Sequence, residues 1–307
     1  MSAIIGKAFY WPTVLLAGVI AGGTTGFEVV QMFKPTATEF IVSGDGYLPD
    51  VDAAFAKYEE AKGSGNFASA LTADEMINVA YRLFSLEEET WSQGVGASIA
   101  AGFVNQGIQS MTVHSGERYF EESNSFSSII QIYDRMFQEG DTTTTYWGGD
   151  TNYASHPKKE YPNDEYKKLM GRYVSEGLVY IVSPKTLILD ADTPSGKPAS
   201  GITETPDGYV IEAELDKRYG VINYQCQMQT ISDLKYKPQF QFCHITVTVD
   251  KQLNLQRMVT FEHYTAVTSQ GVGSDAEGSL VTVYHHEPAP FGFPEVGGTV
   301  APYPESL

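Results

Sequence analysis

The stretch of residues 209–216, YVIEAELD, decides the fold that we predict for this chain. Its odd-numbered positions are all apolar, whereas three of its even-numbered positions are acidic. Because successive side chains of a strand point to opposite faces of a sheet, this alternation predicts a strand with one buried and one solvated face. The same period recurs at residues 222–229 and 245–249, and longer β-like runs follow at residues 257–268 and 279–287. The second half of the chain is therefore predicted to be a meander of antiparallel strands.

A helix with a clear start precedes these strands. Thr72, followed three positions later by Glu75, forms a capping box, in which the two side chains bond to exposed amide groups of the first helical turn. Apolar residues then recur at helical spacing: Met76, Val79, Ala80, Leu83 and Phe84. We predict a helix over residues 73–85 that lies with this stripe on the apolar face of the sheet.

The region between this helix and the meander also favours strands. Short β-like runs lie at residues 108–113, 118–121, 127–137 and 142–147. A polar insert at residues 150–176 interrupts the strands, and its apolar spacing predicts one short amphipathic helix at residues 163–173. The Gly-, Ser- and Asp-rich loop 270–278 is predicted to join the last two strands. The Pro- and Gly-rich tail 291–307 is not expected to form regular structure.

The first 35 residues contain an apolar segment. Residues 8–27 carry no charge, and about 20 such residues are enough to cross a bilayer as a helix. Three interpretations stay open: an uncleaved membrane anchor, a cleaved signal peptide centred on residues 14–20, or a buried helix of a soluble protein. Turn-forming residues over 36–70, around a short helical stretch at residues 50–62, predict a stalk or linker, which leaves residues 71–290 as the folded domain.

The strands GYVIEAELD, FCHITVTVD and RMVTFEHYTAV, preceded by a capped helix, resemble the LolA- and LppX-like half-barrel envelope proteins, which are related to lipoprotein carriers. The resemblance covers residues 70–290 and rests on the order of the strands and on their residue patterns. It implies an α+β fold in which a curved antiparallel sheet, the half-barrel, is covered by a helix. Most of these proteins are lipidated on a cysteine, and residues 1–35 of this chain contain none.

The charge balance excludes one class of partner. The chain has 38 Asp and Glu residues against 20 Lys and Arg, a formal net charge of −18. Binding of nucleic acid requires clustered basic residues that displace counterions from phosphates, and the sequence has no basic stripe. An acidic surface also repels anionic lipid headgroups. We therefore predict that the chain does not bind nucleic acid.

The two cysteines fall on segments that the pattern predicts to pair. If residues 221–230 and 239–250 form a hairpin, Cys226 stands directly opposite Cys243. Opposed Cα atoms in an antiparallel pair lie about 5 Å apart, within reach of a disulfide. Two buried free thiols are the alternative. Disulfides persist in oxidising compartments, so this pairing agrees with export of the domain.

His263, His285 and Glu287 are the candidates for a metal site. A turn near Ser274 would place His263 opposite His285, with Glu262 or Glu287 as a carboxylate ligand. Ordinary polar residues at a sheet edge are the alternative, because neither CxxC nor HExxH spacing occurs. The chain also lacks a GxSxG elbow and a P-loop, so we predict no cofactor and no catalytic residue.

Aromatic residues gather in the turn-rich region before the polar insert. Tyr146, Trp147, Tyr153 and Tyr161 are predicted either to form an exposed ligand-binding rim or to pack within the protein.

Together these features favour a non-enzymatic protein that acts outside the cytoplasm, tethered to the cell membrane by its N-terminal segment or secreted. Its expected partner is an apolar or amphipathic, lipid-like ligand or an envelope protein. A ligand would lie in an unfilled pocket between the helix 73–85 and the sheet. The alternatives are a structural or adhesive surface domain without a pocket, and a hydrolase or metal-dependent enzyme that uses His263 and His285.

Overall fold

The computed structural model describes residues 51–100, 104–127, 131–163, 165–166, 200–215, 235–267, 271, 273–298 and 303. The apolar segment 1–35 lies outside these ranges, as do the predicted strand 222–229 and most of the predicted helix 163–173. Within the described ranges, no helix is both long and apolar enough to cross a membrane.

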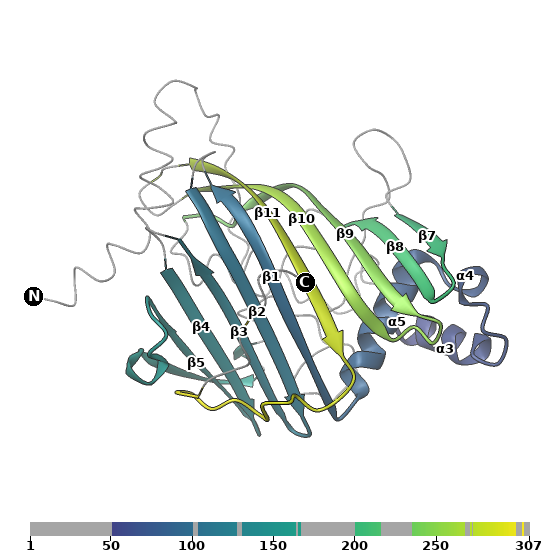
Figure 1. The fold of residues 1–307 in the computed structure, drawn as a ribbon, viewed down its shortest axis with the longest axis horizontal. Coiled ribbons are helices and arrows are strands. Elements are labelled where there is room, and N and C mark those ends of the chain that lie inside the picture. The colour runs from purple at the N-terminus through teal and green to yellow at the C-terminus, as the bar shows by residue number, and fades with distance from the viewer. Residues whose placement is uncertain are drawn as a thin grey trace, which may run out of the picture.

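Eleven antiparallel strands in these ranges form one open sheet, in the spatial order β6-β5-β4-β3-β2-β1-β11-β10-β9-β8-β7 (Figure 1). The first half of the chain supplies β1 (Glu89–Ala100), β2 (Val104–Ser115), β3 (Arg118–Phe126), β4 (Gln131–Glu139), β5 (Thr142–Gly148) and β6 (Lys158–Pro162). The second half supplies β7 (Ser200–Glu204), β8 (Gly208–Glu214), β9 (Gln239–Asp250), β10 (Leu255–Val267) and β11 (Gly273–His285). With its helices, this curved sheet is the α+β half-barrel that the sequence predicts.

The sheet consists of two meanders that meet at its centre. Strands β1 to β6 follow one another towards one edge, and β11 to β7 run in reverse order towards the other. The meanders are joined where β1 pairs with β11, from Trp91 opposite His285 to Ala100 opposite Ala276. This pairing unites residues 194 positions apart in the sequence (285 − 91).

Three helices pack at one end of the sheet: α3 (Val51–Ala61), α4 (Phe67–Ala70) and α5 (Ala73–Leu86). The capping box predicted for α5 is confirmed, because the Thr72 hydroxyl accepts from the Glu75 amide and the Glu75 carboxylate accepts from the Thr72 amide. Within the segment 36–70 predicted as a linker, residues 51–61 form the helix α3, where a short helical stretch was expected. Tyr58 of α3 and Phe67 of α4 stack on each other and are buried in the same hydrophobic core as α5.

The two faces of the sheet are covered by different parts of the chain. On one side, which we call the helix face, α5 packs on β7, β8 and β10, and one core cluster unites Met76, Ile77, Val79, Tyr209, Ile211, Ile245 and Val247. On the other side, which we call the tail face, the irregular segment 287–298 crosses the strands near their ends (Figure 1). It packs there through Phe291, Phe293 and Val296 on Trp91, Met111, Val113, Phe120 and Phe137.

Strand β1 is not predicted from the sequence, because Gly94 and Gly96 interrupt its pattern. At Gly96 a side chain is excluded, since a Cβ atom would lie 2.1 Å from the carbonyl oxygen of Ser279 on β11. The glycine therefore permits the close approach of the two central strands. The loop predicted at residues 270–278 is too long, since β11 already begins at Gly273.

Candidate ligand-binding face

Glu262 lies near the middle of β10, with its side chain on the helix face. It is 6% exposed, and no hydrogen bond or ion pair joins its carboxylate to a described residue. Burial raises the pKa of Glu262 to about 7 from its ordinary value of 4.5. Buried carboxylates are nearly always paired, so this one marks a candidate functional site.

The residues beside Glu262 are small. Its cross-strand neighbours are Cys243 on β9 and Gly278 on β11, and Ser98 of β1 stands beyond Gly278. A Cβ atom at Gly278 would lie 3.2 Å from Glu262 Oε1, so the glycine leaves room for the carboxylate. Burial, followed by the charge of Glu262, raises the pKa of the Cys243 thiol well above its ordinary value. The sulfur is therefore protonated and unsuited to act as a nucleophile.

Asp134 of β4 is a second carboxylate on the helix face. It stands between Ser123 of β3 and Trp147 of β5, and no described residue forms an ion pair or hydrogen bond with it. Burial, and then the charges of Glu121 and Glu122, raise the pKa of Asp134 to about 8. The helix face thus carries two carboxylates that bind protons near neutral pH.

Aromatic rings accompany Asp134 on this face. Trp147 is its direct neighbour on β5, and Tyr161 of β6 lies close enough that burial and the Asp134 charge together raise the pKa of the phenol. The ring of Tyr161 in turn lies 5.7 Å from that of Tyr166. Carboxylate and aromatic side chains therefore form one continuous surface across β4, β5 and β6.

The aromatic rim predicted from the sequence is divided between the two faces. Trp147 and Tyr161 belong to the helix face, but Tyr146 and Tyr153 lie on the tail face. Tyr146 packs against Phe137 there, and Tyr153 is only 2% exposed. The physical reason is the strand itself, because the adjacent residues 146 and 147 must point to opposite sides of the sheet.

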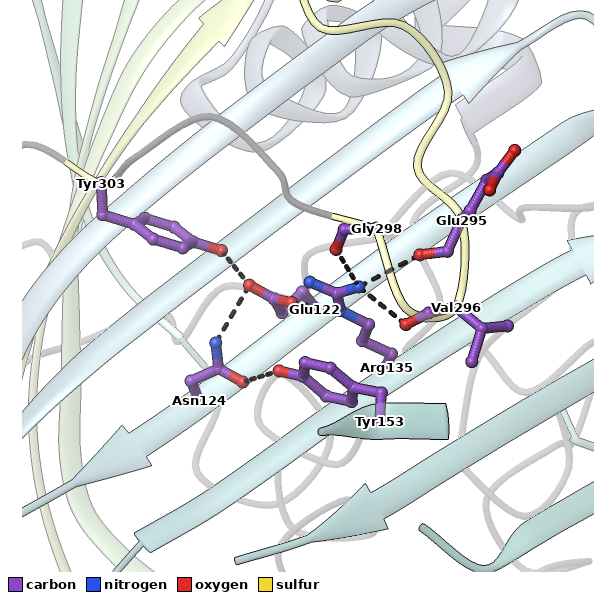
Figure 2. Close-up of polar contacts among 8 residues, drawn as sticks. All are labelled: Glu122, Asn124, Arg135, Tyr153, Glu295, Val296, Gly298 and Tyr303. Carbon is purple, nitrogen blue, oxygen red and sulfur yellow. Dashed lines mark hydrogen bonds and ion pairs between the residues drawn. The ribbon is translucent and has the colours of Figure 1, made fainter. Parts of the chain in front are cut away.

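A buried polar cluster holds the tail on the tail face (Figure 2). Arg135 Nε of β4 donates to Glu122 Oε2 of β3 at 2.6 Å, and these side chains are 5% and 3% exposed. Arg135 Nη1 donates to three tail carbonyl groups between residues 295 and 298, at 3.1, 2.9 and 2.8 Å. Tyr303 Oη and Asn124 Nδ2 donate to the other oxygen of Glu122, at 2.9 and 3.0 Å.

This cluster, which we call the tail clamp, is structural. The Arg135 guanidinium also lies over the Tyr153 ring at 3.9 Å, and the Tyr153 hydroxyl donates to Asn124 Oδ1 at 3.0 Å. A buried ion pair is tolerated when its polar atoms have partners, and no buried side-chain N or O atom of Glu122, Asn124 or Arg135 lacks one. The tail clamp therefore presents no buried, unpaired side-chain atom to a ligand.

The predicted metal site is not assembled, because β10 and β11 pair in a register different from the predicted one. His263 stands opposite Glu277 near the turn of the hairpin. His285 lies at the open end, opposite Trp91 of β1, and stacks on its ring at 3.8 Å. Glu287 is exposed beyond β11. Across the described ranges, no three His, Cys, Asp or Glu side chains converge to hold a metal ion.

Cys243 is a buried free thiol. Its neighbours across the sheet are Glu262 of β10 and, after β8, Leu215, whose amide donates to the Cys243 carbonyl at 2.9 Å. At Cys243, β9 therefore pairs with β10 on one side and with the end of β8 on the other. The pairing that the predicted disulfide requires, with a further strand opposite Cys243, is not available there. Cys226 itself lies outside the described residues.

The interface between α5 and the sheet is filled by side chains. Five residues from both sides of it have 0% exposure and belong to one hydrophobic cluster: Met76, Ile77, Val79, Ile211 and Val247. Close packing of this kind leaves no room for a ligand between them. The pocket predicted beneath the helix is therefore not the candidate site, which is instead the surface around Glu262; Asp134 lies on the same face, five strands away along the sheet.

Sequence reasoning missed Asp134 and named Glu262 only as a possible metal ligand, although a signal for both was present. In the run RMVTFEHYTAV, Glu262 shares its parity with Met258, Tyr264 and Ala266, which lie on the side that faces the helices. Asp134 shares its parity with the fully buried Met136. An acidic residue at a position where the alternation of a strand calls for an apolar one is the pattern that indicates a buried carboxylate.

Comparison with known proteins gives a remote likeness of fold. No protein-family model and no curated protein matches the chain. Among solved structures, a LolA superfamily protein from Nitrosomonas europaea is similar, with 9% sequence identity and a TM-score of 0.24. The match covers 70% of this chain and 92% of that protein. A likeness this distant carries no argument about function.

Proposed function

We propose that this chain is a non-enzymatic binding protein whose helix face holds an amphipathic ligand. The observation that supports this is Glu262, a carboxylate 6% exposed on an open sheet, with no partner among the described residues. Burial of an unpaired carboxylate is unfavourable. A ligand that donates a hydrogen bond or brings a positive charge would offset this unfavourable term.

The surface around Glu262 fits a ligand with an apolar body. Leu280 of β11 and Ile108 of β2 lie on the same face, beside the small side chain of Ser98. Met136 and the aromatic rings near Asp134 continue this face towards the β6 edge. A long-chain amine, with an apolar chain and a cationic head that donates hydrogen bonds, is the ligand class that this combination favours.

Binding of three amphiphiles of equal chain length tests the ligand class. Dodecylamine, dodecanol and lauric acid are titrated against the purified chain at pH 8, where Glu262 is ionised, and tryptophan fluorescence reports binding. We expect dodecylamine to bind most tightly. Glu262→Gln should weaken its binding about tenfold or more, because a charge-assisted hydrogen bond is lost.

Glu117→Gln is the matched control, since it removes an exposed carboxylate in the turn between β2 and β3. It should bind dodecylamine as the wild type does. Equal affinity for the three amphiphiles, or an unchanged affinity in Glu262→Gln, would reject Glu262 as the recognition group.

The proposal includes a location outside the cytoplasm. The apolar run 8–27 suits a membrane tether or an export signal, and the acidic composition suits a soluble domain beyond it. Protease added to intact cells that express the chain with a C-terminal tag should remove the tag. Protection of the tag until the cells are lysed would contradict this location and leave the ligand proposal intact.

A further inference from the structure

An apolar patch lies on the tail face, away from the tail. The strand register places six side chains of β1, β9, β10 and β11 on this side, which we call the outer patch: Val95, Ile99, Phe242, Val259, Phe261 and Val281. Phe261 is 45% exposed and Ile99 is 44% exposed, two of the three large apolar side chains that are exposed within the described ranges. Phe242 packs on Phe261, with ring centroids 5.2 Å apart.

The described tail segment 287–298 does not cover the outer patch. It packs at the opposite end of the same strands, on Trp91 and Val113 among others. On β1, Ile99 lies eight positions beyond Trp91 (99 − 91), which is about 26 Å along a strand. Figure 1 looks onto this face and shows residues 287–298 along the lower ends of β1 to β4. The outer patch is therefore a separate surface.

Acidic side chains border the outer patch. Glu212 of β8 and Asp275 and Glu277 of β11 are exposed on the tail face by the register of their strands, whereas Glu214 of β8 is 14% exposed and lies 3.3 Å from His244 Nδ1. Against the three exposed carboxylates, the described parts of β8 to β11 and β1 place one Arg or Lys on this face, Arg257 of β10. The outer patch thus has an apolar centre and a negative rim.

We infer that the outer patch is the docking surface for a protein partner that presents an apolar centre within a basic rim. Exposed apolar areas with a polar border mark interaction sites, and complementary charge selects the partner. A second copy of this chain would bring the same acidic rim, so like charges oppose its approach. Anionic lipid headgroups are repelled for the same reason, and the net charge of −18 strengthens both effects. The inference concerns the face opposite Glu262 and does not depend on the ligand proposed there.

A pair of designed peptides tests the charge preference. The probe is an amphipathic helix of about 18 residues with Leu and Trp on one face and Lys on the other, and its twin carries Glu in place of Lys. Fluorescence anisotropy measures binding to the full chain at about 0.05 M and about 0.5 M salt. We expect the Lys peptide to bind and to lose affinity at high salt, whereas the Glu peptide does not bind.

Variants of the exposed apolar residues locate the binding surface. Phe261→Ala and Ile99→Ala should each weaken binding of the Lys peptide about tenfold, since central apolar residues dominate such interfaces. Leu86→Ala removes the third exposed apolar side chain, which lies on α5, and should bind as the wild type does. In the double variant Glu212→Gln with Glu277→Gln, binding of the Lys peptide should lose most of its dependence on salt.

Three results would overturn the inference. The first is equal binding of the Lys and Glu peptides, and the second is wild-type affinity in both Phe261→Ala and Ile99→Ala with unchanged circular dichroism. The third is self-association, or binding to phosphatidylglycerol vesicles, that is abolished by Phe261→Ala. That result would assign the outer patch to a second copy or to a lipid surface.

Discussion

Replacing Glu262 by glutamine removes the ionisable group from the centre of the helix face while keeping the size of the side chain. The pKa of Glu262 is about 7 in the folded chain and has its ordinary value of 4.5 when the chain is unfolded. The folded protein therefore holds a proton that the unfolded chain releases. The stability that this group contributes is fully present below pH 4.5 and is lost as the pH rises through about 7.

The size of the effect follows from the two pKa values. Their difference is about 2.5, and each pH unit corresponds to about 1.4 kcal/mol, so the wild type loses about 3 kcal/mol of stability through this group. Glutamine cannot ionise and escapes this loss. The free energy of unfolding of Glu262→Gln, relative to wild type, should therefore rise by about 3 kcal/mol between pH 4.5 and pH 8.

Urea unfolding of the ligand-free wild type and of Glu262→Gln, measured at both pH values, provides the test. Comparing the two proteins at each pH cancels the contributions of all other titrating groups. Glu117→Gln, which removes an exposed carboxylate, is again the control. A Glu262→Gln difference that is the same at both pH values would refute the reasoning, because Glu262 would then be ionised and stabilised within the fold.

Three further predictions concern other parts of the fold. Asp134→Asn should stabilise the chain at pH 9 and not at pH 4, because the pKa of Asp134 is raised to about 8. If the difference in urea midpoint between the variant and the wild type is the same at both pH values, this prediction is wrong. Arg135→Ala should lower the free energy of unfolding in urea by about 3–5 kcal/mol, since Glu122 is left buried and unpaired. Limited proteolysis should then cleave the tail, and a tail that stays protected would show that Arg135 does not hold it. Gly96→Ala should lower the thermal midpoint by several degrees, because the added Cβ atom meets the Ser279 carbonyl; an unchanged midpoint would show that β1 and β11 can separate there.

Elements whose signal lies within a few residues were predictable. The alternation that begins at Tyr209 identified β8, and Thr72 with Glu75 identified the first turn of α5. Strand β1 was not predictable in this way, because Gly94 and Gly96 carry no strand signal. Whether glycine is required at these two positions depends on how closely β11 approaches β1.

Predicting the candidate site required the register between strands, which predicting these single elements did not. The sequence placed Glu262 on a strand, but the lack of a partner follows from which residues stand beside it, Cys243 and Gly278. The predicted turn near residue 274 put the wrong residues opposite one another, and the pairing of His263 with Glu277 shows the error. A shift in register changes every cross-strand neighbour at once, although the alternation within each strand is unaffected.

By itself the sequence determined that the chain is acidic, that its second half forms antiparallel strands, and that a capped helix supplies an apolar stripe to cover them. These properties depend on residues that are near neighbours along the chain. Only the tertiary structure decided that β1 joins β11, that Tyr146 and Trp147 serve opposite faces, and that Arg135 holds the tail. Such contacts link distant segments, and they are selected by the packing of the whole sheet rather than by any local pattern.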